Sequence, residues 1–168
     1  YRGSLGEYDG QLLEVNEETV TKYEEAMEKM EFSVALTSIW QLVSRTNKYI
    51  DETKPWALAK DEERKQELGS VMVHLAESLR RIAILLQPFL TRTPAEIFSQ
   101  LNVEDKNLQT WESLEKFGLI PEGIKVVKGS PIFPRLDITE EVEFIKVQMQ
   151  GPAAPQEETK ALTEEAIP

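Results

Sequence analysis

The sequence predicts an all-α protein: an antiparallel helix bundle followed by an extended C-terminal strap and a flexible tail. Three observations lead to this fold class. Apolar residues recur every three or four positions as far as Phe117, prolines and glycines fall between these periodic segments, and the periodicity is lost after Gly118. A chain of 168 residues with 40% hydrophobic content is long enough to bury one core.

The first predicted helix runs from Glu17 to Lys29. Asn16 stands directly before two acidic residues, and a helix favours Asn at its N-cap and acids in its first turn, where they offset unpaired N–H groups and the helix dipole. Residues 1–15 contain three glycines among scattered apolar residues, so we expect a lead-in loop there.

The second predicted helix spans Glu31 to Glu52. Residues that share one helix face fall three or four positions apart along it: Phe32, Leu36, Ile39, Val43, Thr46 and Ile50. Pro55 ends this helix, because proline lacks the N–H that a helix needs and disfavours helical geometry in the residue before it.

The clearest periodicity follows Pro55 and predicts a third long helix. Its apolar stripe is Leu68, Met72, Leu75, Leu79, Ile82, Leu86 and Phe89. We expect neighbouring helices of the same chain to bury this stripe; a dimerising coiled coil is the alternative, but only about three heptads are present. His74, the only histidine, lies beside the stripe and is expected at the helix surface or boundary.

The remaining segments complete the predicted organisation. The sequence Thr93-Pro94-Ala95-Glu96 is a capping box with proline at the first helical position, which predicts a short helix from Pro94 to Leu101. A last helical turn is expected within 108–117, so the predicted bundle covers residues 16–117. Prolines and glycines then predict an extended strap over 118–146, and an acidic linker rich in Pro, Ala and Glu over 147–168.

Composition argues against several classes of function. The chain has no cysteine and one histidine, which disfavours a zinc site built on thiolates or on several histidines. It contains no Gly-rich phosphate loop and no nucleophile elbow. No run of about eighteen apolar residues and no apolar leader is present, so we expect a cytoplasmic protein without a membrane segment.

Charge is unevenly distributed along the chain. The net charge of −11 argues against a protein whose whole surface binds nucleic acid, because lysine and arginine contacts dominate phosphate binding. Between Arg45 and Arg92, however, nine basic residues stand against seven acidic ones. This stretch permits a local basic face, although an ordinary solvated helix surface is the more common explanation of such a charge pattern.

The most informative stretch is the predicted corner around Trp56. The tryptophan follows Pro55 directly, at a junction between two helices, and three lysines surround it in sequence: Lys48, Lys54 and Lys60. An exposed aromatic ring beside cations suits single-stranded RNA, which offers bases for stacking and phosphates for ion pairing. The alternative is a buried tryptophan that packs at the junction between the helices.

Several motifs resemble the anticodon-binding domain of methionyl-tRNA synthetases. The resemblance covers residues 16–146 and rests on these segments: Asn47-Lys48-Tyr49-Ile50-Asp51, Lys54-Pro55-Trp56, Leu75-Ala76-Glu77-Ser78-Leu79-Arg80, Leu86-Gln87-Pro88-Phe89 and Ile132-Phe133-Pro134-Arg135-Leu136-Asp137. It implies that Trp56 stacks on the anticodon and that Pro55 fixes its direction. The family's base-edge contacts come from an Asn and a basic residue on a preceding helix that the sequence does not include, so Asn47 and Lys54 are secondary candidates.

The resemblance also implies what the rest of the protein does. The chain lacks the His-Ile-Gly-His and Lys-Met-Ser-Lys-Ser signatures, so ATP-dependent esterification of methionine to its tRNA, with ATP and Mg²⁺, is expected in a separate catalytic domain of the same protein, and no cofactor is expected in this segment. The strap is expected to pack on that domain, with Arg135 as a candidate for coupling or simply a structural arginine. The acidic linker resembles a tether to a further tRNA-binding domain, through which the parent protein could form a homodimer.

Two other functions remain open from the sequence. One is the equivalent domain of a related class I synthetase that uses another apolar amino acid. The absence of a Pro-Trp corner in those synthetases would distinguish them. The other is a non-enzymatic helical module that binds a protein partner through its apolar strap and acidic tail.

Overall fold

The computed structural model describes residues 6–149, and the regular structure within that range is helical. The elements are α1 (Asp9–Glu28), α2 (Phe32–Thr53), α3 (Pro55–Leu58), the 3₁₀ helix η1 (Glu62–Arg64), α4 (Lys65–Leu86), α5 (Thr93–Leu101), the 3₁₀ helices η2 (Lys106–Gln109) and η3 (Trp111–Leu114), and α6 (Ile138–Met149). The described chain divides into two units, a helical bundle up to Ile132 and the segment from Phe133 onward. The all-α prediction is therefore confirmed.

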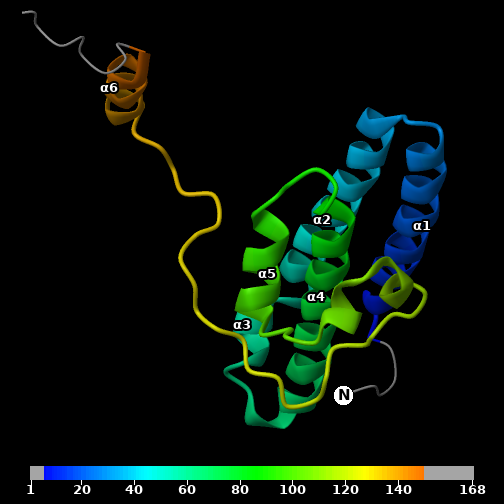
Figure 1. Ribbon diagram of the computed structural model, residues 1–168. Helices are drawn as coiled ribbons and strands as arrows, with labels where there is room; N and C mark the ends of the chain where they lie inside the picture. Colours follow the sequence, from blue (N-terminus) through cyan, green and yellow to red (C-terminus); the bar gives the residue numbers. More distant parts are fainter. Residues whose placement is uncertain (1–5, 150–168) are drawn as a thin grey trace, which may run out of the picture. The chain divides into compact units, whose positions relative to one another are not determined.

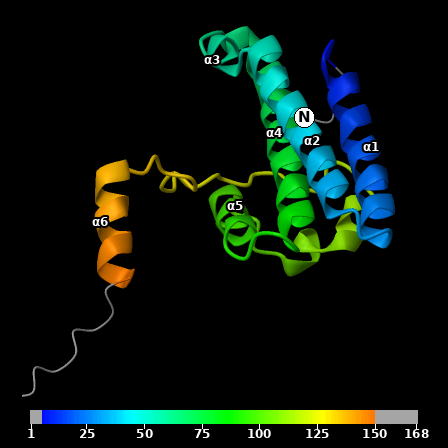
Figure 2. The same cartoon turned by 90° about the horizontal axis from the view of Figure 1, so that it is seen from above.

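Three long helices form the centre of the bundle. A tight turn joins α1 to α2 with Met30 in the left-handed region (φ 58°), so the two helices run antiparallel side by side. Helix α4 packs against α2 and carries α5 on its other side, and the short α3 lies beside the beginning of α4 (Figures 1 and 2). This arrangement leaves the α2–α3 junction at one end of the bundle and the α1–α2 turn at the other.

The buried apolar residues of the bundle form two separate clusters. The larger lies among α1, α2, α4 and α5 and includes Ile39, Leu42, Leu85 and Phe98. The smaller, here the tip cluster, contains Leu12, Tyr49, Leu58, Val71 and Leu75. Because the tip cluster draws a residue from each of α1 to α4, it is the part of the core that lies behind the α2–α3 junction.

Helix α1 begins earlier than predicted. Residues 9–15, expected within a lead-in loop, are helical, and Asn16 is no N-cap but lies fully buried inside the helix. Its Nδ2 donates to the Leu12 carbonyl at 2.9 Å and to Ser78 Oγ at 3.1 Å. The inward face of α1 includes polar side chains that form hydrogen bonds with other helices of the bundle. Apolar periodicity therefore does not reveal the first two turns of this helix.

Helix α4 is also rotated relative to the predicted stripe. Leu75, Ile82 and Leu86 are buried as expected, but Met72 and Leu79 are 45% and 40% exposed. Their places on the inward face are taken largely by neighbouring positions: Val71, Glu77, Ser78, Arg80, Arg81, Ala83, Ile84 and Leu85. The buried face of α4 is thus wide and partly charged, which a narrow apolar stripe could not indicate.

The later segments differ from the prediction at their ends. Helix α5 begins at Thr93 with Pro94 in its first turn, so its N-cap is Arg92, which makes no side-chain cap hydrogen bond, and Thr93 is not the cap residue that the capping box predicts. The expected helical turn within 108–117 is present as parts of η2 and η3.

The predicted strap ends in a helix. No helix or strand occurs between residues 118 and 137, but α6 occupies 138–149 and corrects the extended prediction for 138–146 and the linker prediction for 147–149. Asp137 Oδ1 accepts from the backbone N–H groups of Thr139 (2.8 Å) and Glu140 (3.3 Å), and this capping starts the helix. The rest of the predicted linker, 150–168, lies outside the described residues.

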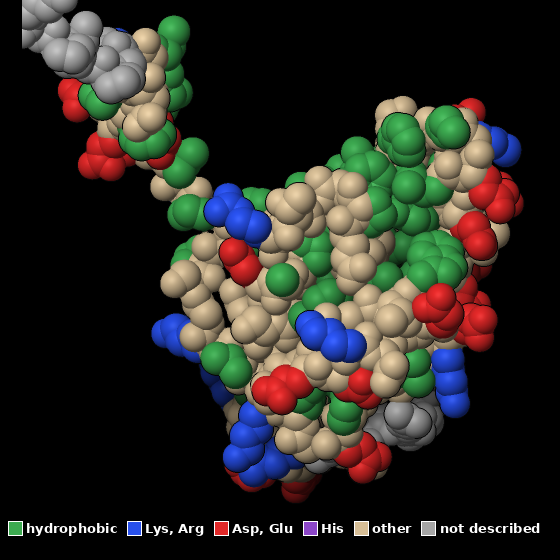
Figure 3. All heavy atoms as spheres, in the orientation of Figure 1, with side chains coloured by type: hydrophobic (Ala, Val, Ile, Leu, Met, Phe, Trp, Pro, Cys, Tyr) green, Lys and Arg blue, Asp and Glu red, His purple; other side chains and the backbone are tan. Residues whose placement is uncertain are grey.

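Hydrophobic side chains also gather at the end of the bundle where α1 turns into α2 (Figure 3). Met30 and Phe32 are exposed there, and Phe32 contacts Phe89 edge to face at 6.4 Å between ring centroids. Tyr23 contacts both Phe89 and Trp111, which continues the row of aromatic rings. This surface lies at the opposite end of α2 from Trp56.

A buried ion pair on α4 fixes the path of the chain after α5. Glu77 and Arg80 are both fully buried and pair at 2.6 Å. Arg80 also donates to the carbonyls of Leu108 and Ser113 at 2.6 and 3.1 Å, and Glu77 Oε2 accepts from the Ile120 N–H at 3.2 Å. Burial of these charges is compensated because each has several hydrogen-bond partners.

Glu77→Ala is expected to lower the free energy of unfolding by about 3–5 kcal/mol, because it leaves the Arg80 guanidinium buried without its counter-charge. The matched control is Glu67→Ala. Glu67 pairs with Arg64 at the same helix spacing and at 2.6 Å, but both side chains are 51% exposed, and water screens such a pair. Urea unfolding followed by circular dichroism measures both variants, and equal losses would contradict burial as the cause.

Candidate nucleic-acid interface

The junction between α2 and α3 is a sharp corner formed by Lys54, Pro55 and Trp56. Lys54 adopts a left-handed conformation (φ 47°, ψ 61°), and its N–H donates to the Ile50 carbonyl at 2.9 Å, which closes the last turn of α2. Pro55 then occupies the first turn of α3, where its missing N–H costs nothing. A non-glycine residue in this region costs about 1–2 kcal/mol, so the corner has a defined and slightly strained geometry.

Helix α3 presents Trp56 to solvent and buries Leu58. Trp56 is 55% exposed, whereas Leu58, two residues later, is 1% exposed in the tip cluster. The interpretation of Trp56 as a buried junction residue is therefore wrong. Leu58 anchors the short helix in the tip cluster, and the indole ring of Trp56 lies at the surface.

Two lysines beside the corner carry unneutralised charge. Lys48 lies 3.6 Å from Glu52, but Lys54 and Lys60 take part in no ion pair within residues 6–149. The acids that follow Lys60 are engaged elsewhere, since Asp61 accepts from the Glu63 N–H at 3.0 Å and Glu62 pairs with Lys65. The sequence analysis placed Lys60 among the three lysines around Trp56 but did not select it as a site residue, whereas Lys54 stands closer to Trp56 in the sequence.

The other candidates lie at different places. Asn47 is exposed on α2, seven residues before Lys54, which is about 10 Å along the helix axis. The structure therefore joins Lys54, Pro55 and Trp56 in one corner with Asn47 two turns away. Arg135 is exposed and belongs to the second unit.

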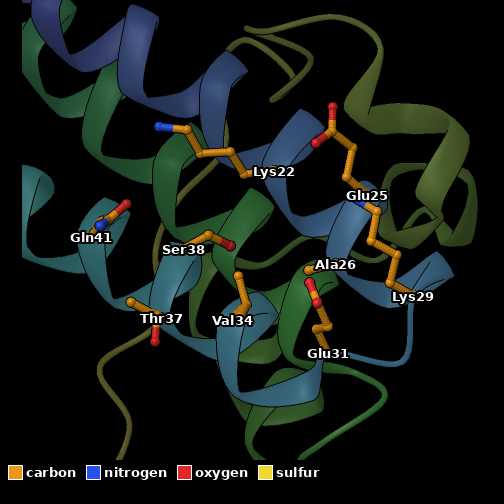
Figure 4. A pocket seen from close by; sticks show the side chains of 9 residues that line it. All are labelled: Lys22, Glu25, Ala26, Lys29, Glu31, Val34, Thr37, Ser38 and Gln41. Carbon is orange, nitrogen blue, oxygen red and sulfur yellow. The ribbon is translucent and has the colours of Figure 1, made fainter.

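Other surfaces of the described chain offer less chemistry. A cavity of about 280 Å³ opens between α1 and α2 (Figure 4) and is lined by Lys22, Glu25, Ala26, Lys29, Glu31, Val34, Thr37, Ser38 and Gln41. The Ser38 hydroxyl donates back to the Ala35 carbonyl at 2.7 Å, and no histidine lines the cavity that could act as a base for it. Residues 6–149 contain no group of three or more His, Asp or Glu side chains suited to a metal ion, and none of their helices is long and apolar enough to cross a membrane.

A helical bundle with an exposed tryptophan and unpaired lysines at one fixed corner has the features of an RNA-binding module. Comparison with known protein families identifies the family to which this module belongs. Residues 1–153 match the family model described as the anticodon binding domain of methionyl tRNA ligase, and the chain belongs to this family.

Curated relatives and solved structures agree with this assignment. The chain is 58% identical over 160 residues to methionine–tRNA ligase of Bacillus subtilis (strain 168), which covers 95% of the chain and 24% of that protein. Identity to methionine–tRNA ligase of Listeria innocua is 58% over 161 residues, with the same coverage. The chain thus spans about a quarter of the length of the relatives it matches.

The fold is shared with a solved synthetase of lower sequence identity. The apo form of Mycobacterium tuberculosis methionyl-tRNA synthetase superposes with a TM-score of 0.73 at 21% identity, covering 82% of the chain and 27% of that protein. The same enzyme with methionyl-adenylate gives a TM-score of 0.72, also at 21% identity, with coverages of 80% and 26%.

The buried Leu58 and the exposed Trp56 of α3 are expected to differ in how much they contribute to stability. Leu58→Ala is expected to lower the free energy of unfolding by about 2–5 kcal/mol, because it empties part of the tip cluster. Trp56→Ala is expected to change it by less than about 0.5 kcal/mol, as is usual for an exposed side chain. Urea unfolding measures both variants. A large loss of unfolding free energy for Trp56→Ala would show that the indole ring stabilises the fold by packing.

Proposed function

We propose that the chain binds the anticodon loop of methionine tRNA and contributes the recognition step of a full-length methionine–tRNA ligase. The observation that carries this proposal is the exposed indole of Trp56 on a corner whose direction is fixed by Lys54 and Pro55. The family match supports the same assignment.

Each residue of the corner has a distinct role in this proposal. Trp56 stacks on an anticodon base, a contact worth about 1–3 kcal/mol per base. Pro55 restricts the backbone so that the ring is held in place before RNA arrives, and Lys54 contacts the phosphate backbone. Lys60 supplies a second phosphate contact, because its charge is unpaired within the described residues. Asn47 has an exposed amide that offers both a donor and an acceptor to a base edge.

The remaining steps belong to the rest of the parent protein. Its catalytic domain, in the same polypeptide, uses ATP and Mg²⁺ to esterify methionine to its tRNA in the cytoplasm. The relatives are methionine–tRNA ligases, and a structural neighbour holds methionyl-adenylate, which supports this reaction. The strap with Arg135 packs on the catalytic domain, and a further C-terminal domain would join two copies.

The two alternative functions receive less support. Identity of 58% to methionine–tRNA ligases over almost the whole chain favours methionine over another amino acid. A module that binds only a protein partner does not account for the exposed tryptophan and unpaired lysines on one corner.

Trp56→Ala, in a full-length methionine–tRNA ligase that carries this chain as its anticodon segment, tests the proposal. The KM for methionine tRNA in aminoacylation is expected to rise by roughly 5- to 150-fold, which corresponds to the loss of about 1–3 kcal/mol of stacking. Methionine activation by ATP without tRNA is expected to be unchanged, because that reaction does not use the anticodon.

Trp40→Ala is the matched control for this experiment. Trp40 is also on the surface of the bundle at 52% exposure, but it lies on α2, thirteen residues before the end of the helix. A rise in KM for Trp56→Ala that Trp40→Ala does not share supports the corner as the interface. Unchanged aminoacylation for Trp56→Ala excludes it.

The lysines are tested by salt dependence. Lys54→Gln and Lys60→Gln are each expected to weaken tRNA binding and to reduce the slope of log K against log salt concentration by about 0.7, the value for one phosphate contact to a single strand. Lys29→Gln is the control, because Lys29 is exposed at the opposite end of α2. Filter binding between 50 and 300 mM KCl gives the slopes, and equal slopes for all variants contradict the phosphate contacts.

A further inference from the structure

A buried polar pair lies behind the exposed corner, in the tip cluster. Tyr49, the third residue of the Asn-Lys-Tyr motif, is fully buried, and its hydroxyl donates to Asp9 Oδ1 at 2.5 Å. Asp9, at the beginning of α1, is 4% exposed, and its Oδ2 accepts from the Gly6 N–H at 2.7 Å. The pair therefore joins the beginning of α1 to the last turns of α2.

Other polar side chains surround this pair. His74 of α4 lies with Nε2 4.0 Å from Asp9 Oδ2, and its ring contacts those of Tyr49 and Phe117 at 6.3 and 5.7 Å between centroids. Arg45 of α2 donates to the Tyr8 carbonyl at 3.3 Å. Asp9 of α1 and His74 of α4 thus both contact the Tyr49 side chain.

Tyr49 is connected directly to the corner. Its backbone carbonyl accepts from Thr53 Oγ1 at 2.7 Å, one residue before Lys54. Its ring packs in the tip cluster with Leu58, the buried residue of α3. The Tyr49 ring is therefore part of the buried surface on which α3, the helix that carries Trp56, rests.

The donor and acceptor roles in the Tyr49–Asp9 hydrogen bond are fixed by the chemistry of the two groups. Burial, followed by the hydrogen bond to Asp9, raises the pKa of the Tyr49 hydroxyl far above its ordinary value, so it remains protonated and acts as a donor. Asp9 Oδ1 accepts the hydrogen bond that this hydroxyl donates, at 2.5 Å between the two oxygens. The ring is held in one position by this bond as well as by packing.

We propose that Tyr49 and Asp9 are positioning residues for anticodon recognition: their hydrogen bond holds α3 at the angle at which Trp56 meets the RNA. Neither residue touches the RNA, and both act through Trp56. The inference rests on the proposed function, since it needs Trp56 as the stacking residue.

Tyr49→Phe tests the inference, again in a full-length ligase that carries this chain. It removes one hydroxyl and leaves the ring. The KM for methionine tRNA is expected to rise at least about fivefold, toward the value for Trp56→Ala, with the kcat of tRNA-independent methionine activation unchanged. The double variant Tyr49→Phe/Trp56→Ala is expected to show no further rise beyond Trp56→Ala, because one residue acts through the other.

Two controls separate positioning from stability. Tyr23→Phe removes the hydroxyl of another buried tyrosine, which lies in the larger core cluster. Ile39→Val weakens that same cluster without touching the tip. Neither is expected to change the KM for tRNA, even where the midpoint of urea unfolding falls as far as it does for Tyr49→Phe. A KM that follows the unfolding midpoint in all three variants overturns the inference.

Variants of Asp9 keep the test decisive if Tyr49→Phe folds poorly. Asp9→Asn retains one oxygen that can accept from the Tyr49 hydroxyl, but its NH2 group cannot accept from the Gly6 N–H. It is expected to raise the KM less than Asp9→Ala, which is expected to match Tyr49→Phe. Equal KM values for the two Asp9 variants, or fully additive losses in the double variant, overturn the positioning role. An unchanged KM for Trp56→Ala overturns the proposed function itself, whereas a raised KM for Trp56→Ala alone overturns only the role of Tyr49 and Asp9.

Discussion

The buried charges of α4 are the constraint on which the rest of the bundle depends. Glu77 and Arg80 occupy an inward face that a simple amphipathic helix would fill with apolar side chains, and their hydrogen bonds go to backbone groups of the segment that follows α5. Because that segment has no long helix of its own, side chains of α4 satisfy backbone groups that secondary structure would otherwise pair. One helix therefore organises both the core and the chain that leaves it.

The same helix links the two ends of the bundle. Its first turns pack beside α3 and contribute Val71 and Leu75 to the tip cluster, and its last turns lie in the larger cluster with α5. The corner is exposed on a surface whose position is set by buried residues from four helices. This division between an exposed contact and a buried support is how a rigid scaffold presents a small recognition element.

The sequence predicted those features that depend on local chemistry. Pro55 ended α2 at the expected place, and the lysines and tryptophan beside it identified the corner. Features that depend on tertiary partners were missed. Asn16 resembled an N-cap because its partner Ser78 is distant in the sequence. The buried face of α4 was misplaced because the backbone groups that Glu77 and Arg80 bind, at Leu108, Ser113 and Ile120, are also distant in the sequence.

The separation of the two core clusters has a consequence for the dynamics of the molecule. The tip cluster has five buried apolar residues with three partly buried ones packed against it, whereas the larger cluster involves most of the bundle. Free energies of local opening scale with the buried apolar contacts that must be broken, so the α2–α3 end opens more readily than the centre and exchanges its amide hydrogens sooner. A ligand that binds only the closed tip suppresses this opening by mass action. Occupancy of the corner is thus recorded as slowed amide exchange in the last turns of α2, at positions that no ligand covers.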